Sequence, residues 1–122
     1  MSAHDIRIKR IYDAPARDDG ARVLVDRLWP RGIKKSDLGL AAWLKDVAPT
    51  TALRKWFGHD PARWTEFQRR YRAELEKNAA AVAELLALAR KGRVTLLYSA
   101  RDAEHNQAVV LAEFLDEGAR RS

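Results

Sequence analysis

Two segments of this 122-residue chain place residues that can do chemistry directly after apolar runs of strand type. In residues 23–32 the run Val-Leu-Val leads into Asp26, Arg27, Trp29, Pro30 and Arg31. In the second segment an apolar run leads into Tyr98, Ser99, Arg101, Asp102 and Asn106. Guanidinium groups bind phosphate and carboxylate groups in a bidentate manner, and carboxyl groups exchange protons with ligands. These residue types favour a site for an anionic ligand.

Each polar residue of the two segments has a candidate role. If the protein is an enzyme, the predicted catalytic residues are Asp26, as acid or base, and Ser99, as hydroxyl donor. The predicted ligand-binding residues are Arg27, Arg31, Tyr98, Arg101 and Asn106. Structural roles remain open beside these. Asp26 and Arg27 would then form a buried ion pair, and Ser99 would cap a turn or a helix.

The histidines and the absence of cysteine limit the chemistry further. His59 precedes a helical segment, and His105 falls on the first turn of the last one, where it faces either a cleft or solvent. No histidine cluster has metal-ligand spacing, so we predict neither a metal nor a cofactor. With no cysteine, thiol catalysis and disulfides are excluded.

The elements that position these residues follow from the hydrophobic pattern. Apolar or alternating runs predict strands over residues 6–12, 22–26 and 94–98. Three-to-four spacing of apolar residues predicts helices over 36–47, 52–57 and 103–117. From Asp60-Pro61 to Lys91 the same spacing predicts either one long helix or two with a break near Asn78.

Strands separated by helices indicate one α/β domain over residues 1–122. We expect a small three-layer fold, with a mostly parallel three-stranded sheet flanked by helices and strand 6–12 in its middle. Parallel strands bring their carboxyl ends to one edge, where α/β folds bind ligands. Both polar clusters should therefore line one crevice at this edge, beside the N-terminus of the last helix.

The net charge and the hydropathy pattern limit the classes of partner and the cellular location that we expect. A net charge of +6 favours an anionic partner, with a phosphate-bearing small molecule as the leading expectation. The alternatives are a nucleic-acid-binding module, with weak and non-specific binding, and a structural or partner-binding protein without catalysis. No segment has the length and apolarity to span a membrane, and no secretory signal is evident, so we expect a cytoplasmic protein. The sequence does not indicate an oligomeric state.

Three segments, in the same order, resemble the YeaO-like proteins of the domain-of-unknown-function 488 family. They are residues 22–32, the Trp-Phe-Gly-His-Asp-Pro sequence at 56–61, and the Leu-Leu-Tyr-Ser-Ala-Arg-Asp sequence at 96–102. Wider members of that family carry a strand ending in Val-Asp-x-Arg, which corresponds loosely here to Val25, Asp26 and Arg27. They also carry a later loop with Cys-His-Arg, which this chain replaces with the cysteine-free residues 99–106. The resemblance therefore implies the family's fold without any thiol-based reaction.

Overall fold

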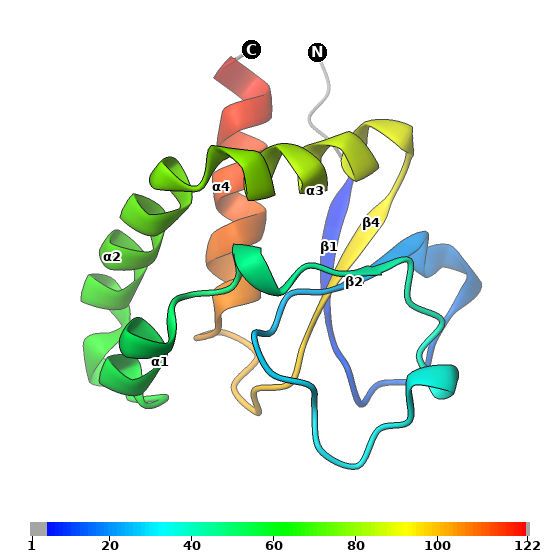
Figure 1. The fold of residues 1–122 in the computed structure, drawn as a ribbon, viewed down its shortest axis with the longest axis horizontal. Helices are drawn as coiled ribbons and strands as arrows, with labels where there is room; N and C mark the ends of the chain where they lie inside the picture. The colour runs from blue at the N-terminus through cyan, green and yellow to red at the C-terminus, as the bar shows by residue number, and fades with distance from the viewer. Residues whose placement is uncertain (1–4, 122) are drawn as a thin grey trace.

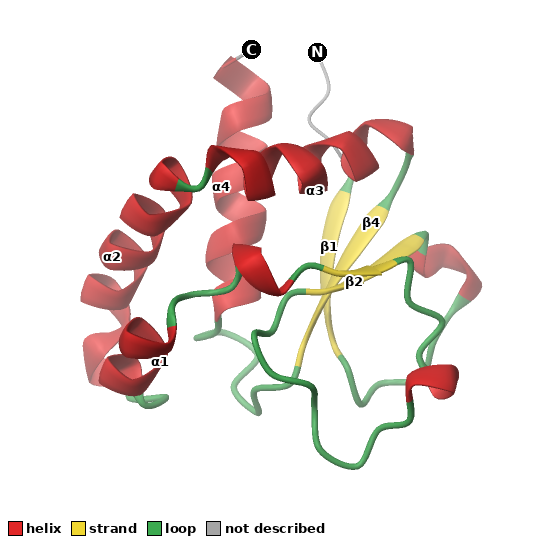
Figure 2. Cartoon of the chain, in the orientation of Figure 1, coloured by secondary structure: helices red, strands yellow, loops and turns green. Residues whose placement is uncertain are grey.

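A four-stranded parallel sheet is the centre of the fold in the computed structural model, which describes residues 5–121 and their side chains to residue 118. Its strands are β1 (Ile6–Arg10), β2 (Ala21–Leu24), β3 (Ala42–Trp43) and β4 (Val94–Tyr98). They lie in the order β1-β4-β2-β3, and each neighbouring pair is parallel (Figure 2). The predicted α/β class with a parallel sheet and flanking helices is confirmed, and β3 is a fourth strand that was not predicted.

The strand order differs from the prediction, because β4 and not β1 lies between its neighbours. All five residues of β4 are buried, as a central strand requires. By contrast, β1 alternates apolar with basic residues and exposes Arg7 and Ile8, which suits an edge strand. Since β2 pairs directly with β4, the residues that follow these two strands are closer together than the predicted order would place them.

The four longer helices pack against one face of the sheet: α1 (Thr51–Phe57), α2 (Trp64–Lys77), α3 (Ala79–Lys91) and α4 (Gln107–Arg121) (Figure 1). Their apolar side chains and those of β2 and β4 form one core cluster, in which Phe67, Tyr71 and Leu85 are fully buried. Two helices separated at Asn78, rather than one long helix, occupy the segment for which both were considered. No helix in the described range is long and apolar enough to cross a membrane.

The other face of the sheet is covered by the connection between β2 and β3. Its Trp29, Ile33 and Leu40 pack against a second cluster, which contains Leu24 and Leu97 from the sheet. The helix predicted over residues 36–47 is wrong. This segment instead contains two short 3-10 turns, β3 and Gly39, whose φ of +59° interrupts a right-handed helix. Pairing of β3 with β2 and burial of Leu38 outweigh the helical spacing.

Candidate functional site

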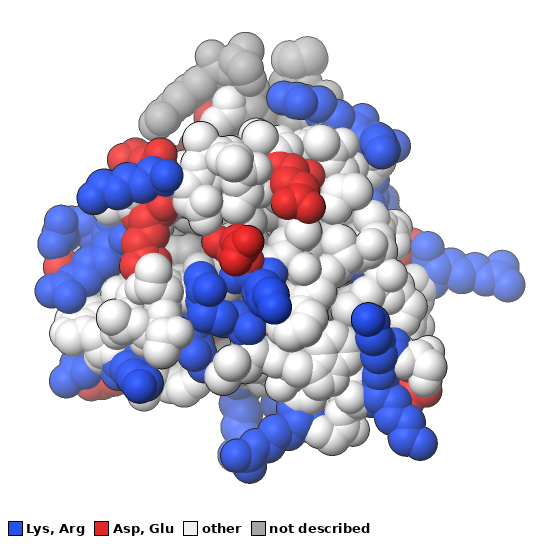
Figure 3. Space-filling view, in the orientation of Figure 1, with Lys and Arg blue, Asp and Glu red and all other residues white. Residues whose placement is uncertain are grey.

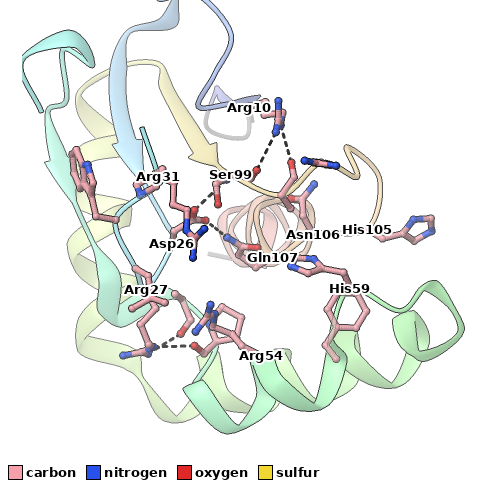
Figure 4. A pocket seen from close by; sticks show the side chains of 18 of the residues that line it. Arg10, Asp26, Arg27, Arg31, Arg54, His59, Ser99, His105, Asn106 and Gln107 are labelled. Atoms are coloured by element: carbon pink, nitrogen blue, oxygen red, sulfur yellow. Dashed lines mark hydrogen bonds between the residues drawn. The ribbon is translucent and has the colours of Figure 1, made fainter. Parts of the chain in front are cut away.

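A cleft of about 720 Å³ lies at the carboxyl ends of β2 and β4 (Figure 4). Five arginines line it, namely Arg10, Arg27, Arg31, Arg54 and Arg101. Two histidines, His59 and His105, line it as well. Among the described residues that form its wall, Asp26 is the single carboxylate. The cleft is therefore a strongly cationic space around one buried acid.

Asp26 lies two residues beyond the end of β2 and is 8% exposed. Its Oδ2 accepts a hydrogen bond of 3.1 Å from the backbone N–H of Ser99, and its Oδ1 accepts one from the side-chain amide of Gln107 (Figure 4). Burial raises the pKa of Asp26, although the hydrogen bonds from Ser99 and Gln107 and the charge of Arg54 act in the opposite direction. The carboxyl group thus ties the β2 loop to the β4 loop and to the start of α4.

The ion pair considered between Asp26 and Arg27 is not formed. Arg27 instead donates from Nε to the carbonyl of Pro49 at 3.0 Å and from Nη2 to that of Ala48 at 3.1 Å. Among the described side chains, Asp26 has no salt-bridge partner within 4.0 Å. Arg27 lines the cleft but is anchored to the segment that leads into α1, and the carboxylate of Asp26 is left without a paired cation.

Three of the arginines have guanidinium groups available to a ligand. Arg31, Arg54 and Arg101 are exposed, and within residues 5–118 none of their guanidinium groups makes a hydrogen bond. Arg10 is held more firmly: its Nε donates to the carbonyl of Ala100 at 3.0 Å. Arg31, Arg54 and Arg101 come from three separate segments and converge on one cleft.

The rim beside Arg10 is stabilised by a ring contact. The guanidinium of Arg10 lies 4.6 Å from the ring centre of Tyr12, and the Tyr12 hydroxyl donates to the Arg31 carbonyl at 3.0 Å. These contacts hold the backbone of Arg31 in place while its side chain remains exposed. The loop after β2 is therefore anchored to the loop after β1.

The remaining predicted residues differ in how they relate to the cleft. Ser99 lines it and binds Asp26. Tyr98 is buried in the main core and is not among the residues that line the cleft. Asn106 lines the cleft, but its amide caps α4: Oδ1 accepts from Val109 N at 3.2 Å, and Nδ2 donates to the Asp102 carbonyl at 2.9 Å.

His105, whose position was open between cleft and solvent, lies at the cleft, and so does His59. Nδ1 of His105 lies 2.8 Å from Oδ2 of Asp102, and its ring meets that of Trp64 edge-on at 5.2 Å. His59 follows the left-handed Gly58 that ends α1 and has a positive φ of 56° itself. This backbone turn directs the chain from α1 back along the cleft toward α2.

The lining residues that sequence reasoning did not assign to the site include Arg10, Arg54 and Gln107. Arg10 ends β1, so the rule that placed Asp26 and Ser99 at the carboxyl edge also points to Arg10. Gln107 directly follows the predicted Asn106. No sequence signal marks Arg54, because α1 reaches the cleft only through tertiary packing. No group of three metal-ligating side chains occurs among the described residues.

The fold and the cleft define a small α/β protein whose parallel sheet carries an arginine-lined cleft at its carboxyl edge. The chain belongs to the DUF488 family, since the family model described as the inactive DUF488-N3 subclade matches residues 5–122. It is 46% identical over 111 residues to the uncharacterized protein YeaO of Escherichia coli, an alignment that covers 91% of this chain and 96% of the relative. An uncharacterized protein of Mycobacterium tuberculosis is 45% identical over 111 residues, with 91% and 93% covered. No solved structure matches the chain significantly.

Proposed function

We propose that this protein binds a small anionic, phosphate-bearing ligand in the cleft. The observation that carries the proposal is the convergence of Arg31, Arg54 and Arg101, exposed and without hydrogen-bond partners for their guanidinium groups in the described range. Planar guanidinium groups match the geometry of phosphate oxygens and bind them bidentately. Gathered positive charge is self-repulsive, and a bound anion relieves that repulsion.

Binding, rather than catalysis, is the function that we favour. The matching family model carries the description inactive, and the chain has no cysteine to act as a nucleophile. Asp26 is the one carboxyl group of the cleft, and both of its oxygens accept hydrogen bonds from the protein. These contacts suit a residue that positions a ligand.

The buried acid supports an enzymatic alternative. Burial raises the pKa of Asp26, which is the adjustment that general acids show in enzymes. In that case Asp26 would exchange the proton and Ser99 would donate a hydrogen bond to the developing charge. If the alternative holds, the protein hydrolyses a phosphate ester. Asp26→Asn should then abolish this turnover without weakening the binding of the ester.

Thermal unfolding with inorganic phosphate tests the proposed binding. A ligand that binds only the folded state stabilises it by about 2.7 kcal/mol at a concentration of roughly 100 Kd. We expect phosphate to raise the Tm of the protein above that in sodium chloride of equal ionic strength. The triple variant Arg31→Ala/Arg54→Ala/Arg101→Ala should lose this increment.

The matched control removes the same charge outside the cleft. Arg17, Arg90 and Lys91 are exposed and do not line it, so their joint replacement by alanine should preserve the increment. Equal phosphate stabilisation of both triple variants would show that phosphate acts as a general salt, and would contradict binding at this site.

A further inference from the structure

A carboxylate in an arginine-lined cleft is unexpected for a site that binds only anions without a hydrogen-bond donor. A negative charge beside a bound anion weakens binding by repulsion. Asp26 nevertheless lines the cleft, and no ion pair with a described side chain neutralises it. A neutral residue would serve an anion without a hydroxyl donor better. The acid therefore indicates a ligand that carries a hydrogen-bond donor as well as an anionic group.

The hydrogen-bond capacity of Asp26 is not exhausted by the protein. An ionised carboxyl group has about four acceptor positions. The backbone N–H of Ser99 and the amide of Gln107 occupy two of them. At least one position remains, on a residue that lines the cleft. Ser99 and Gln107 each donate to a different oxygen of the Asp26 carboxyl group and so fix its orientation. The remaining acceptor position is available to a ligand.

The cleft is also larger than an inorganic anion requires, and part of its wall is apolar. Its volume of about 720 Å³ falls within the range of sites for organic ligands, roughly 300 to 1,000 Å³. Leu28, which is 60% exposed, lines it together with Trp29 and Pro30. The side chains of Leu28 and Pro30 suit contact with the carbon skeleton of a ligand. The cleft thus combines a cationic rim, an apolar wall and a buried acceptor.

From this combination, and given the anion binding proposed above, we infer that the ligand is a hydroxyl-bearing phosphate ester of the phosphorylated-sugar class. Its phosphate group binds Arg31, Arg54 and Arg101, and a hydroxyl group donates to the carboxylate of Asp26. The carbon skeleton lies along the wall formed by residues 28–30. Asp26 then selects against anions that lack a donor, because they leave its carboxylate unsatisfied beside their own charge.

Calorimetric titration of the intact protein with four compounds tests this inference. Inorganic phosphate and methyl phosphate carry no sugar hydroxyl, glycerol 3-phosphate is an open-chain hydroxylated ester, and ribose 5-phosphate is a cyclic one. We expect the Kd of at least one hydroxylated ester to be about tenfold or more below that of methyl phosphate, as a hydrogen bond to a charged group predicts. Preference for the glycerol or the ribose ester distinguishes an open-chain from a cyclic skeleton.

Variants of Asp26 assign the preference to its carboxylate. Asp26→Ala should remove the preference, and Asp26→Asn, which retains a weaker acceptor, should reduce it. Both variants should bind methyl phosphate at least as tightly as the unmodified protein does, since a repulsive charge is gone. Asp37→Asn is the matched control, because Asp37 is exposed and outside the cleft, and it should leave the preference unchanged. If the alanine variant does not fold, the asparagine variant alone decides.

The outcomes separate this inference from the function on which it rests. Binding of methyl phosphate as tight as that of both hydroxylated esters would overturn the inference and leave anion binding intact. A preference that persists in Asp26→Asn and Asp26→Ala would also overturn it, since the donor would then be recognised elsewhere. Failure of all four compounds to bind would overturn the proposed function as well.

Discussion

At the scale of single residues, the most specific prediction concerns Asp26 and the pH dependence of the free energy of unfolding. Burial raises its pKa, because the charged form loses hydration, while hydrogen bonds from Ser99 and Gln107 and the charge of Arg54 oppose the rise. A carboxyl group whose pKa is raised by folding contributes most to the free energy of unfolding below its ordinary pKa. That contribution is lost as the pH rises through the folded-state pKa.

Asp26→Asn should therefore change how stability depends on pH. Without ligand, we expect the variant to match the unmodified protein at low pH and to gain on it as the pH rises through the folded-state pKa. Gln107 can rotate its amide to accept from the new amide, so the hydrogen bonds need not be lost. Urea unfolding from about pH 3 to about pH 8 measures the difference. Parallel stability curves for the two proteins would contradict the raised pKa.

Residue types alone indicated part of the cleft lining. Asp26, Ser99, Arg31 and Arg101 line the cleft because they follow strands whose carboxyl ends meet at one edge. Arg54 was not predictable, because nothing in α1 indicates which part of the sheet the helix approaches. The partners of Arg27 were also hidden, since they are the backbone carbonyls of Ala48 and Pro49.

At the scale of elements, Asn106 at the start of α4 could have a structural role or a ligand-binding role, and two substitutions distinguish them. Its side chain caps the helix by accepting from Val109 N and holds the preceding turn through the Asp102 carbonyl. Asn106→Ala should lower the free energy of unfolding by about 1 to 2 kcal/mol, whereas Asn106→Ser, which retains a cap acceptor, should recover most of it. Urea unfolding gives these values. A phosphate-induced rise in Tm that disappears in Asn106→Ser would instead assign the amide to the ligand.

A buried ionic cluster joins the turn before β2 to the sheet. Asp19, 7% exposed, accepts from Arg22 Nη1 and from Lys9 Nζ at 3.1 Å, and Arg22 is itself only 5% exposed. Asp19→Ala leaves the buried Arg22 without its counter-charge and should cost about 3 to 5 kcal/mol in chemical unfolding. Asp37→Ala, at an exposed position, is the control. A loss below about 1 kcal/mol for the Asp19 variant would show that the cluster is solvated.

The elements themselves were predictable where local pattern and tertiary packing agree. The strands have apolar or alternating patterns, the helix predicted over 52–57 ends at Phe57, and Asp60-Pro61 marks a helix start as expected. The helix prediction over residues 36–47 was wrong because the apolar residues of this segment pack in a different way. Leu38 and Trp43 instead cover the second face of the sheet from irregular backbone and from β3.

At the scale of the whole molecule, charge distribution bears on nucleic-acid binding. Lys and Arg side chains are scattered over the face seen in Figure 3 and lie beside acidic ones. Proteins that contact six or more phosphates lose roughly 10³-fold or more in affinity between about 50 and 200 mM salt. We expect weak duplex binding with a shallower salt dependence, measured by fluorescence anisotropy of a labelled duplex. A Kd below about 1 μM at physiological salt would contradict this expectation.

The fold class followed from the alternation of apolar strands and helices along the chain, whereas the strand order did not. Propensity finds strands but does not rank them from centre to edge. The distinguishing feature was burial: β4 is buried throughout, and β1 carries Arg7 and Lys9. This difference puts β2 beside β4 and brings Asp26 to the Ser99 amide.

The central claim is that an anion binds at the carboxyl edge of β2 and β4, and residue-resolved NMR tests it most directly. Titration of ¹⁵N-labelled protein with phosphate, at constant ionic strength, follows every backbone amide. We predict saturable shifts that concentrate in residues 26–31 and 99–107 and near Arg54. Amides near Arg17, Arg90 and Lys91 should move little. Non-saturating shifts spread over the whole basic surface, or none at the cleft, would contradict the claim.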